Sequence, residues 1–229
     1  EVFSLISTRF EQIVVELGVS VPIQELLAEI RARIQAGEGP DYAASRGEFV
    51  SGHIVAALLG YDFVDPAEIV AFDERGVFLP EETNRRVSAR LAKHQRAVVS
   101  GFYGSKPDGK IKTFSRGGSD ITGAIVARGV TAGVYENWTD VSGLLMTDPR
   151  IVPHAKPMEE VTYAEIRELS YMGASVLHDE AISPVREVGI PICIRNTNAP
   201  DHPGTRIVNK LSDHIEKTTA PANVVPLRA

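Results

Sequence analysis

The sequence predicts an α/β fold, a three-layer αβα sandwich in which a mainly parallel sheet lies between two layers of helices. Helical and β-rich segments alternate along the chain, and this alternation favours parallel strands joined by crossover helices. The chain has 229 residues, of which 43% are hydrophobic, so it can bury one sizeable core or two small ones.

Apolar residues recur with helical spacing in segments that end at Gly, Pro or polar clusters. These segments are Val2–Leu17, Ile23–Ile34, Phe49–Leu59 and Glu81–Lys93, then Ile121–Arg128, Tyr163–Tyr171 and Glu180–Val188. Neither a basic leader nor a cleavage site accompanies the first helical pattern, so we expect no targeting signal and a chain that begins within the fold.

Runs rich in β-branched and aromatic residues predict the strands. They are Glu68–Phe72, Ala97–Phe102, Gly133–Asp140 and Ile190–Asn196, with a short β-like patch, "TRIV", near residue 205. The stretch Tyr103–Phe114 holds a Pro-Asp-Gly turn between extended arms and predicts a β-hairpin. The tail from Thr197 is rich in Pro, Asn and Thr, which indicates a domain over residues 1–205 and a domain edge with a linker over 206–229.

Charge and cysteine content exclude several classes of function. The formal net charge is −6 and no Lys/Arg stripe is present, which argues against a nucleic-acid partner. The composition also argues against a membrane protein. The single cysteine, Cys193, lies in an apolar run without flanking cations, so we expect a buried small hydrophobic side chain. One cysteine permits no internal disulfide, which favours the cytoplasm.

A glycine-containing turn, "SRGGSD", precedes one predicted helix. Gly117 and Gly118 allow close backbone approach and positive φ, while Ser119 or Asp120 can cap the helix. A helix N-terminus attracts anions, and Arg116 adds a rigid fork that matches a carboxylate or phosphate. The alternative is an ordinary capped helix beside a surface arginine, since short glycine motifs match often.

Other polar residues strengthen the interpretation as a site. Thr139 and Asp140 follow a predicted strand, and Thr147–Arg150 lies in the loop beyond, where ligands of open α/β sheets bind. Taken alone, these could be ordinary Asx turns. Glu48 opens an otherwise apolar helix, where an acid also simply satisfies the helix dipole. The segment Ser170–Thr197 predicts a helix, a tight turn, a second helix and a strand.

The joint order of these motifs is specific. From about Ser45 to Thr205 the chain shows "RGE", "GF.G", "RGGSD", "TDV.G", "TDPR", "GA.VLH", "GIPI.IRNT" and "PGT". This order resembles the catalytic domain of the aspartate kinases, within the amino acid kinase superfamily. The resemblance implies ATP-dependent phosphorylation of the side-chain carboxylate of L-aspartate to 4-phospho-L-aspartate, the first step toward lysine, threonine and methionine. It also implies ATP and Mg2+ as cofactors and a homo-oligomer in the full-length parent.

Position by position, the resemblance implies that Glu48 meets the substrate ammonium and Arg116 pairs with the α-carboxylate. It also implies that Ser119 and Asp120 complete that pocket and that Arg116 and Asp120 are the catalytic residues. The nucleotide would lie near Thr139, Asp140, Leu145, Arg150, Ser175 and Val176, with Arg150 near its phosphates. A zwitterion needs one fixed anion and one fixed cation, and phosphoryl transfer needs positioning and charge neutralisation. Mg2+ would be held mostly by water and nucleotide oxygens.

Two departures from the family pattern stand out. Members begin with a strand and a Lys-Phe-Gly-Gly turn that holds the transferring phosphate, and these 229 residues contain no such turn. We therefore expect the N-terminal strand and phosphate loop to be missing and the chain alone to transfer phosphate poorly. Ser175 stands where many members carry lysine, and Leu145 where they carry an aromatic residue.

Rival interpretations remain within and outside the superfamily. A glutamate, acetylglutamate or uridylate kinase is the nearest alternative, although "RGE", "RGGSD" and "TDPR" in this order favour aspartate. A non-catalytic ligand-binding module of the same fold is the alternative of a different class.

Overall fold

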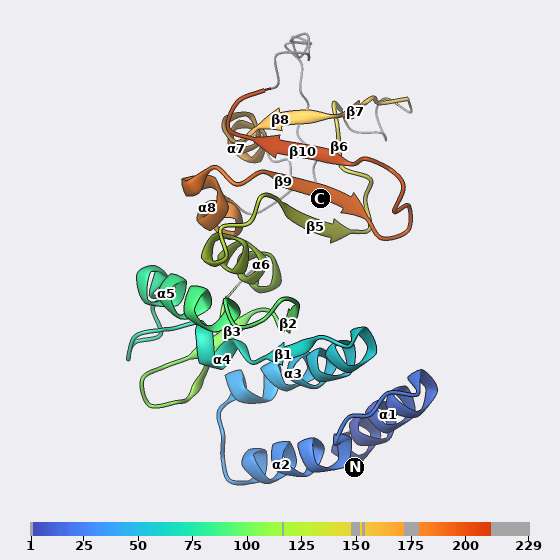
Figure 1. The fold of residues 1–229 in the computed structure, drawn as a ribbon, viewed down its shortest axis with the longest axis vertical. Coiled ribbons are helices and arrows are strands. Elements are labelled where there is room, and N and C mark those ends of the chain that lie inside the picture. The colour runs from blue at the N-terminus through green and yellow to red at the C-terminus, as the bar shows by residue number, and fades with distance from the viewer. Residues whose placement is uncertain (1, 116, 148–151, 153, 172–178, 212–229) are drawn as a thin grey trace. The chain divides into compact units, whose positions relative to one another are not determined.

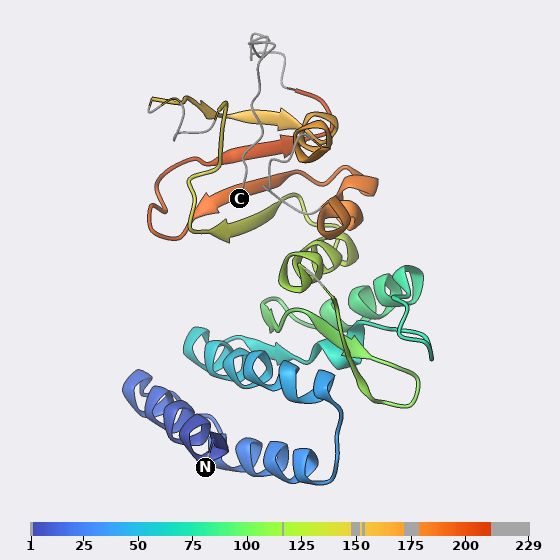
Figure 2. The same ribbon diagram turned by 180° about the vertical axis from the view of Figure 1, so that it is seen from behind.

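The chain folds into helices interspersed with short strands, as Figure 1 shows from one side and Figure 2 from the other. The structure is a computed structural model that describes residues 2–115, 117–147, 152, 154–171 and 179–211. The chain divides into two compact units, Glu1–Ser119 and Asp120–Ala229, which we call the first and the second unit.

The helices of the first unit largely follow the predicted periodicity. They are α1 (Val2–Leu17), α2 (Ile23–Gln35), α3 (Pro40–Leu59), α4 (Pro66–Ile69) and α5 (Pro80–Leu91). Ile23, Leu27 and Ile30 recur along one side of α2 and pack with Val50 and Ile54 of α3 in a buried cluster. The predicted helices that correspond to α1, α2 and α5 are therefore confirmed.

Helix α3 begins at Pro40 rather than at Phe49, where the sequence predicts it. Gly39 is extended, and Pro40 occupies the first helical position, where a missing N–H costs nothing. The first turns also bury Ser45 and Arg46. Because these polar side chains interrupt the apolar pattern, periodicity alone does not reveal the beginning of the helix.

Two pairs of strands complete the first unit. Strands β1 (Asp62–Val64) and β2 (Ala97–Val99) are parallel, and β3 (Tyr103–Ser105) and β4 (Ile111–Thr113) form an antiparallel pair. The predicted hairpin is thus confirmed, with Gly109 in its turn at φ 79°.

The predicted strand Glu68–Phe72 is wrong over most of its length. The side chain of Asp65 accepts a hydrogen bond from the backbone N–H of Ala67, and Pro66 opens the short helix α4. This cap and the proline outweigh the β-propensity of the following residues. Only isolated bridges follow, from Ala71 to Ser105 and from Phe72 to Phe78.

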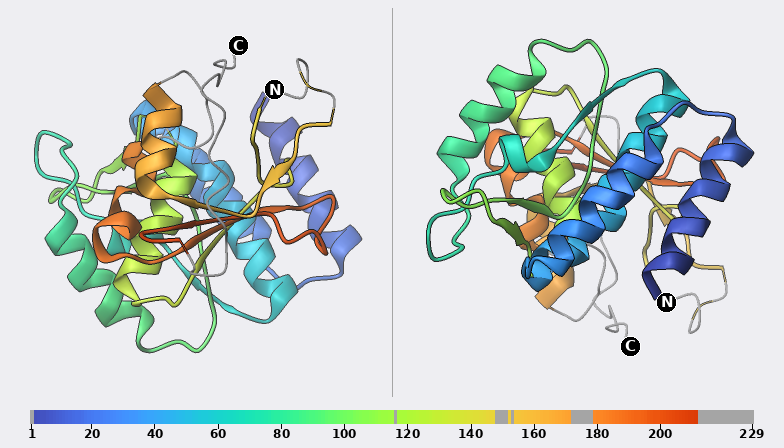
Figure 3. Two further views of the ribbon diagram at one scale, coloured as in Figure 1. Left: turned by 90° about the horizontal axis from the view of Figure 1, so that it is seen from above. Right: turned by 90° about the horizontal axis from the view of Figure 1, so that it is seen from below.

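The second unit contains a four-stranded sheet. Its elements in the described residues are α6 (Gly118–Gly129, which starts in the first unit), β5 (Tyr135–Thr139), β6 (Leu144–Leu145), β7 (Pro157–Met158), β8 (Glu160–Thr162), α7 (Tyr163–Tyr171), α8 (Asp179–Val188), β9 (Ile192–Asn196) and β10 (Thr205–Val208). The sheet order is β5-β9-β10-β8, and only the β9–β10 pair is antiparallel (Figure 1). Figure 3 gives the views of the same ribbon from above and below. The predicted strands that correspond to β5, β9 and β10, and the helices α7 and α8, are confirmed.

Helices α6, α7 and α8 cover one face of this sheet. Ile192, Ile194 and Ile207 point into a buried cluster that includes Ala124 of α6 and Ile166 of α7. Alternate residues are less buried: Glu136 and Trp138 of β5 and Arg206 of β10 are exposed, and Cys193 and Arg195 of β9 are half-buried. This period-two alternation therefore sets the face of the sheet on which each side chain lies, including the polar side chains at the strand ends.

Candidate functional site

The two glycines of the "SRGGSD" turn meet a second tight turn, Ser100–Phe102. The N–H of Phe102 donates to the carbonyl of Gly118 at 3.2 Å, and the carbonyl of Phe102 accepts from the N–H of Phe114 at 2.9 Å. A Cβ added to Gly118 would lie 2.8 Å from Phe102 Cα, and one added to Gly101 would lie 3.0 Å from Ser119 Cα. The two backbones are so close that side chains do not fit between them.

Both turns use left-handed backbone. Gly117 has φ 57°, and Phe102 has φ 64°, which is unusual for a residue with a side chain. A non-glycine residue in this region costs about 1–3 kcal/mol and persists where its surroundings hold it, commonly at ligand sites. The two hydrogen bonds of Phe102 supply such a hold.

Glu48 lies beside the same Ser100–Phe102 turn. Its backbone carbonyl accepts a hydrogen bond from Ser100 Oγ at 2.9 Å. One turn further along α3, Gly52 packs so closely on Phe63 that an added Cβ would lie 2.6 Å from the ring, and Ser100 Oγ would be closer still. The side chains of Glu48 and Ser119 are both exposed. Two of the predicted substrate residues therefore border one turn, and their roles stay predictions.

Asp41, in the first turn of α3, anchors the strand that leads to the glycine turn. Its carboxylate accepts from Lys112 Nζ at 2.9 Å and from Thr113 Oγ1 at 2.8 Å, both on β4. Burial acts to raise the pKa of Asp41, but these hydrogen bonds and the lysine charge outweigh burial and hold it below its usual value. Phe114, which follows Thr113, packs its ring on that of Phe72.

In the second unit, Asp120 is held by strand β5. Its carboxylate accepts from Asn137 Nδ2 at 2.9 Å, and its carbonyl accepts from the Tyr135 hydroxyl at 3.2 Å. Asn137 Nδ2 also contacts the Tyr135 hydroxyl at 3.1 Å. Burial raises the pKa of Tyr135, so this phenol stays a neutral donor. Gly123 leaves the space that the Tyr135 ring fills.

Sequence reasoning missed Asn137 and Tyr135. The available signal is their spacing: both lie at alternate positions of β5 on the side that faces the buried cluster, where a polar residue needs a partner. The expectation that Ser119 or Asp120 caps the helix is wrong, because α6 already begins at Gly118. Both residues therefore lie in its first turn.

Two of the predicted nucleotide residues, Thr139 and Asp140, lie at the carboxyl end of β5, beside the end of the parallel strand β9. Thr139 ends β5, and its Oγ1 donates to Asp140 at 3.1 Å. The carbonyl of Thr139 accepts from both the N–H and the hydroxyl of Thr197, which follows β9. Asn196 Nδ2 donates to Ser142 Oγ at 2.7 Å. Open α/β sheets bind ligands at such ends.

The loop after β5 is fixed by a close approach of backbones. Gly143 has φ 89°, and an added Cβ would lie 2.6 Å from the Thr205 nitrogen. The N–H of Leu144 donates to Thr205 Oγ1 at 2.7 Å. This anchor leaves the predicted nucleotide residue Leu145 exposed on β6.

The positions of four predicted site residues are not given by the structure. Arg116, Arg150, Ser175 and Val176 lie outside the described residues. Among the described residues, no group of three or more His, Cys, Asp or Glu side chains could hold a metal ion. The helices in the same part of the chain are all too short or too polar to span a membrane.

Two other features of the described residues lie apart from the predicted site. Cys193 is half-buried rather than buried, and burial raises the pKa of its thiol. A cavity of about 260 Å3 in the first unit is lined by residues 38–42, 75–76, 106 and 110–112. None of the predicted site residues that the structure describes lines this cavity.

Known proteins similar to this chain are aspartokinases. Aspartokinase 3 of Bacillus subtilis is 42% identical over 179 residues, 74% of this chain and 39% of that protein. Aspartate kinase of Clostridium acetobutylicum has a crystal structure that is 48% identical and superposes with a TM-score of 0.85 over 94% of this chain and 48% of its own. Escherichia coli aspartokinase III, in complex with aspartate and ADP, is 28% identical with a TM-score of 0.71 over 83% of this chain and 46% of its own.

These likenesses confirm the predicted α/β class and the resemblance to the aspartate kinase catalytic domain. The chain spans about half the length, or less, of the relatives it matches. Residues 6–196 match the sequence model of the amino acid kinase family, and the chain therefore belongs to that family.

Proposed function

We propose that this chain supplies the catalytic domain of an aspartate kinase, which transfers the γ-phosphoryl group of ATP to the side-chain carboxylate of L-aspartate. The observation that carries the proposal is the shared turn: Ser100–Phe102 contacts Glu48 on one side and the glycine turn with Ser119 on the other. The 48% identity to an aspartate kinase supports the choice of acceptor.

The chemistry follows from the charges of the two substrates. Glu48 supplies an anion for the ammonium group of aspartate, and Arg116 supplies a cation with planar geometry for its α-carboxylate. Ser119 and Asp120 border the same substrate. With the amino acid held at both charged ends, its side-chain carboxylate is presented to the γ-phosphorus, and the reaction needs positioning more than covalent help.

The nucleotide is assigned to the second unit. We place ATP at Thr139, Asp140, Leu145, Arg150, Ser175 and Val176, with Arg150 near the phosphates. Mg2+ arrives with ATP and is held through phosphate oxygens and water. We assign residues 1–205 to the catalytic domain and residues 206–229 to its edge and a linker toward regulatory domains, with β10 crossing this boundary as part of the sheet.

The biological setting follows from the product. An acyl phosphate of aspartate is the activated compound from which lysine, threonine and methionine synthesis can start. We place this step in the cytoplasm, in a homo-oligomeric full-length protein, without a nucleic-acid or membrane partner.

Two measurements test the proposal. Calorimetric titration of the chain should show binding of aspartate and of ADP, with aspartate preferred over glutamate and N-acetylglutamate. Trapping of the acyl phosphate with hydroxylamine should give product with ATP and aspartate, at a low rate because these 229 residues contain no Lys-Phe-Gly-Gly turn. Preference for glutamate would identify a different kinase of the family, and binding without turnover in any longer form would indicate a non-catalytic module.

A further inference from the structure

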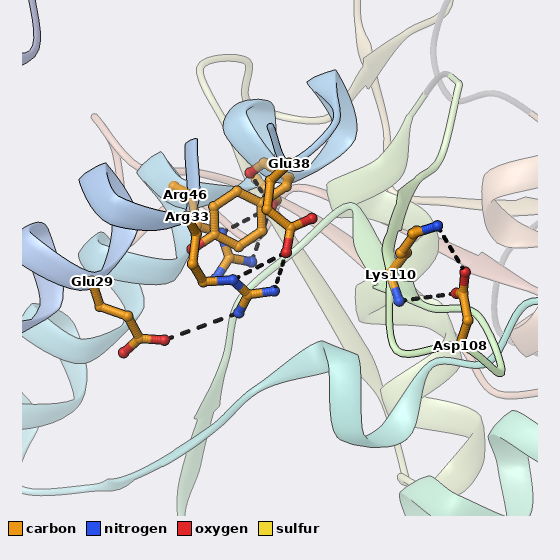
Figure 4. A network of polar contacts seen from close by, with 8 residues as sticks. Glu29, Arg33, Glu38, Arg46, Asp108 and Lys110 are labelled. Carbon is orange, nitrogen blue, oxygen red and sulfur yellow. Dashed lines mark hydrogen bonds and ion pairs between the residues drawn. The ribbon is translucent and has the colours of Figure 1, made fainter. Parts of the chain in front are cut away.

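Arg46, two residues before Glu48, is a buried cation surrounded by aromatic rings. Only 7% of the Arg46 surface is exposed to solvent. The guanidinium carbon lies 4.6 Å from the ring centre of Tyr42, 4.4 Å from that of Phe49 and 5.2 Å from that of Tyr103. Figure 4 shows Arg46 near Arg33, whose own guanidinium lies over the Tyr42 ring.

The hydrogen bonds of Arg46 are local. Its Nε and Nη2 donate to Ser45 Oγ at 3.1 and 2.9 Å, and Ser45 Oγ donates to the carbonyl of Tyr42 at 2.7 Å. Within the described residues, no ion pair joins Arg46 to a carboxylate, whereas Arg33 pairs with Glu38. The rings therefore supply most of the compensation for burying this charge.

Stability alone does not account for such an arrangement. Burying a charge without an anion is costly, and an apolar side chain of similar size commonly replaces a buried ion without loss of stability. What an apolar side chain cannot supply is a flat group that contacts several rings and donates hydrogen bonds at the same time. The guanidinium thereby fixes the orientation of α3 relative to strand β3.

From Arg46, contacts lead to both sides of the predicted aspartate pocket. Tyr103 directly follows Phe102, the residue with left-handed backbone that packs on Gly118. The Tyr103 hydroxyl donates to Asp65 Oδ1 at 2.8 Å, so its ring is fixed at both ends. On the other side, Arg46 and Glu48 lie two residues apart on α3. One buried group thus contacts the helix that carries Glu48 and the strand that adjoins the glycine turn.

We propose that Arg46 is a positioning residue for the amino acid substrate: caged by Tyr42, Phe49 and Tyr103, it sets the distance between Glu48 and the glycine turn. This inference rests on the proposed function. Its signature is a selective effect on aspartate binding, because the cage belongs to the first unit, whereas the residues assigned to the nucleotide belong to the second.

The test compares matched arginine substitutions in the 229-residue chain. Arg46→Lys keeps the charge and loses the flat group, while Arg33→Lys makes the same change at the other cation over Tyr42. Aspartate and ADP affinities are measured by calorimetry. Arg46→Lys should weaken aspartate binding about tenfold and leave ADP binding within about twofold, since small misplacements at a binding site are costly. Arg33→Lys should leave both affinities within about twofold.

Ser45→Ala gives a second, milder route if Arg46→Lys fails to fold. It removes the acceptor of both Arg46 hydrogen bonds and should weaken aspartate binding about threefold without affecting ADP. Unchanged aspartate affinity in the Arg46 and Ser45 variants, or equal weakening of aspartate and ADP, would overturn the inference and leave the proposed function standing. Failure of the unaltered chain to bind aspartate would overturn both.

Discussion

Gly118→Ala is a sharp test of the close approach between the glycine turn and the Ser100–Phe102 turn, because two effects predict opposite changes in the free energy of unfolding. Gly118 lies at the start of α6, where helix propensity favours Ala over Gly by about 1 kcal/mol. The structure opposes this gain, since the new Cβ would lie 2.8 Å from Phe102 Cα and nearer still to its Cβ. Backbone atoms cannot rotate away as a flexible side chain can.

Steric overpacking of this kind costs about 1–3 kcal/mol, so the net loss in free energy of unfolding should be about 1–2 kcal/mol. Gly47→Ala is the matched control, because Gly47 lies within α3 and nothing lies within 4 Å of an added Cβ. It should stabilise the chain by about 0.5–1 kcal/mol. Urea unfolding followed by circular dichroism measures both.

Stabilisation of the Gly118→Ala variant, similar to that of the control, would refute the steric argument. It would mean that the turns separate easily and that the left-handed backbone of Phe102 is not held by Gly118. A loss of stability in both variants would instead point to a general intolerance of side chains in these helices.

Three further substitutions, the last with a matched control, probe polar and charged side chains. Asn137→Asp replaces the amide that donates to Asp120 with a second carboxylate. It should cost about 1.5–3 kcal/mol of unfolding free energy at pH 7 and less at pH 4, where the carboxylates are partly protonated. Equal losses at the two pH values would contradict this. Burial acts to raise the pKa of Asp41, but its hydrogen bonds hold the pKa below the usual 3.8, so its contribution is present above that pH and is lost as pH falls through the folded-state pKa. The stability difference between Asp41→Asn and the unaltered chain should therefore vanish in acid, and a difference that persists at pH 2 would refute the assignment. Arg116→Lys should weaken aspartate binding by about 2–3 kcal/mol and hardly change ADP binding, while Arg128→Lys should change neither.

The parts of the fold that follow from sequence are those with a long, repeated apolar pattern. Helix α1 and strand β9 are examples, since alternation over five residues or periodicity over several turns survives a few polar interruptions. The short strands β1, β6, β7 and β8 were not predicted, because two or three residues carry no measurable period. Their positions are set by pairing with distant segments, which local sequence does not report.

The same limit applies to the candidate site. Motif order predicts Glu48, Ser119 and Asp120 as site residues, but not their hydrogen-bond partners, because those contacts join residues far apart in sequence. Asn137 meets Asp120 only when β5 packs beside α6, and Ser100 meets Glu48 across 52 residues of chain. A carboxylate can be recognised from a motif, whereas its hydrogen-bond partner depends on the tertiary fold.

The glycines of the turn show why a motif and its physical reason must be kept apart. Positive φ at Gly117 agrees with the sequence argument. Gly118, however, is required by its contact with Phe102, a residue of the protein itself, so the missing side chain leaves no room for a ligand there. Binding of an anion at this turn must therefore depend on side chains rather than on close approach to Gly118. It follows that Gly118→Ala should act first on stability, while Arg116→Lys should act on aspartate affinity at unchanged stability. The two substituted positions lie only two residues apart. A reversal of these effects would therefore show that Gly118 serves ligand binding rather than the packing of its turn against Phe102.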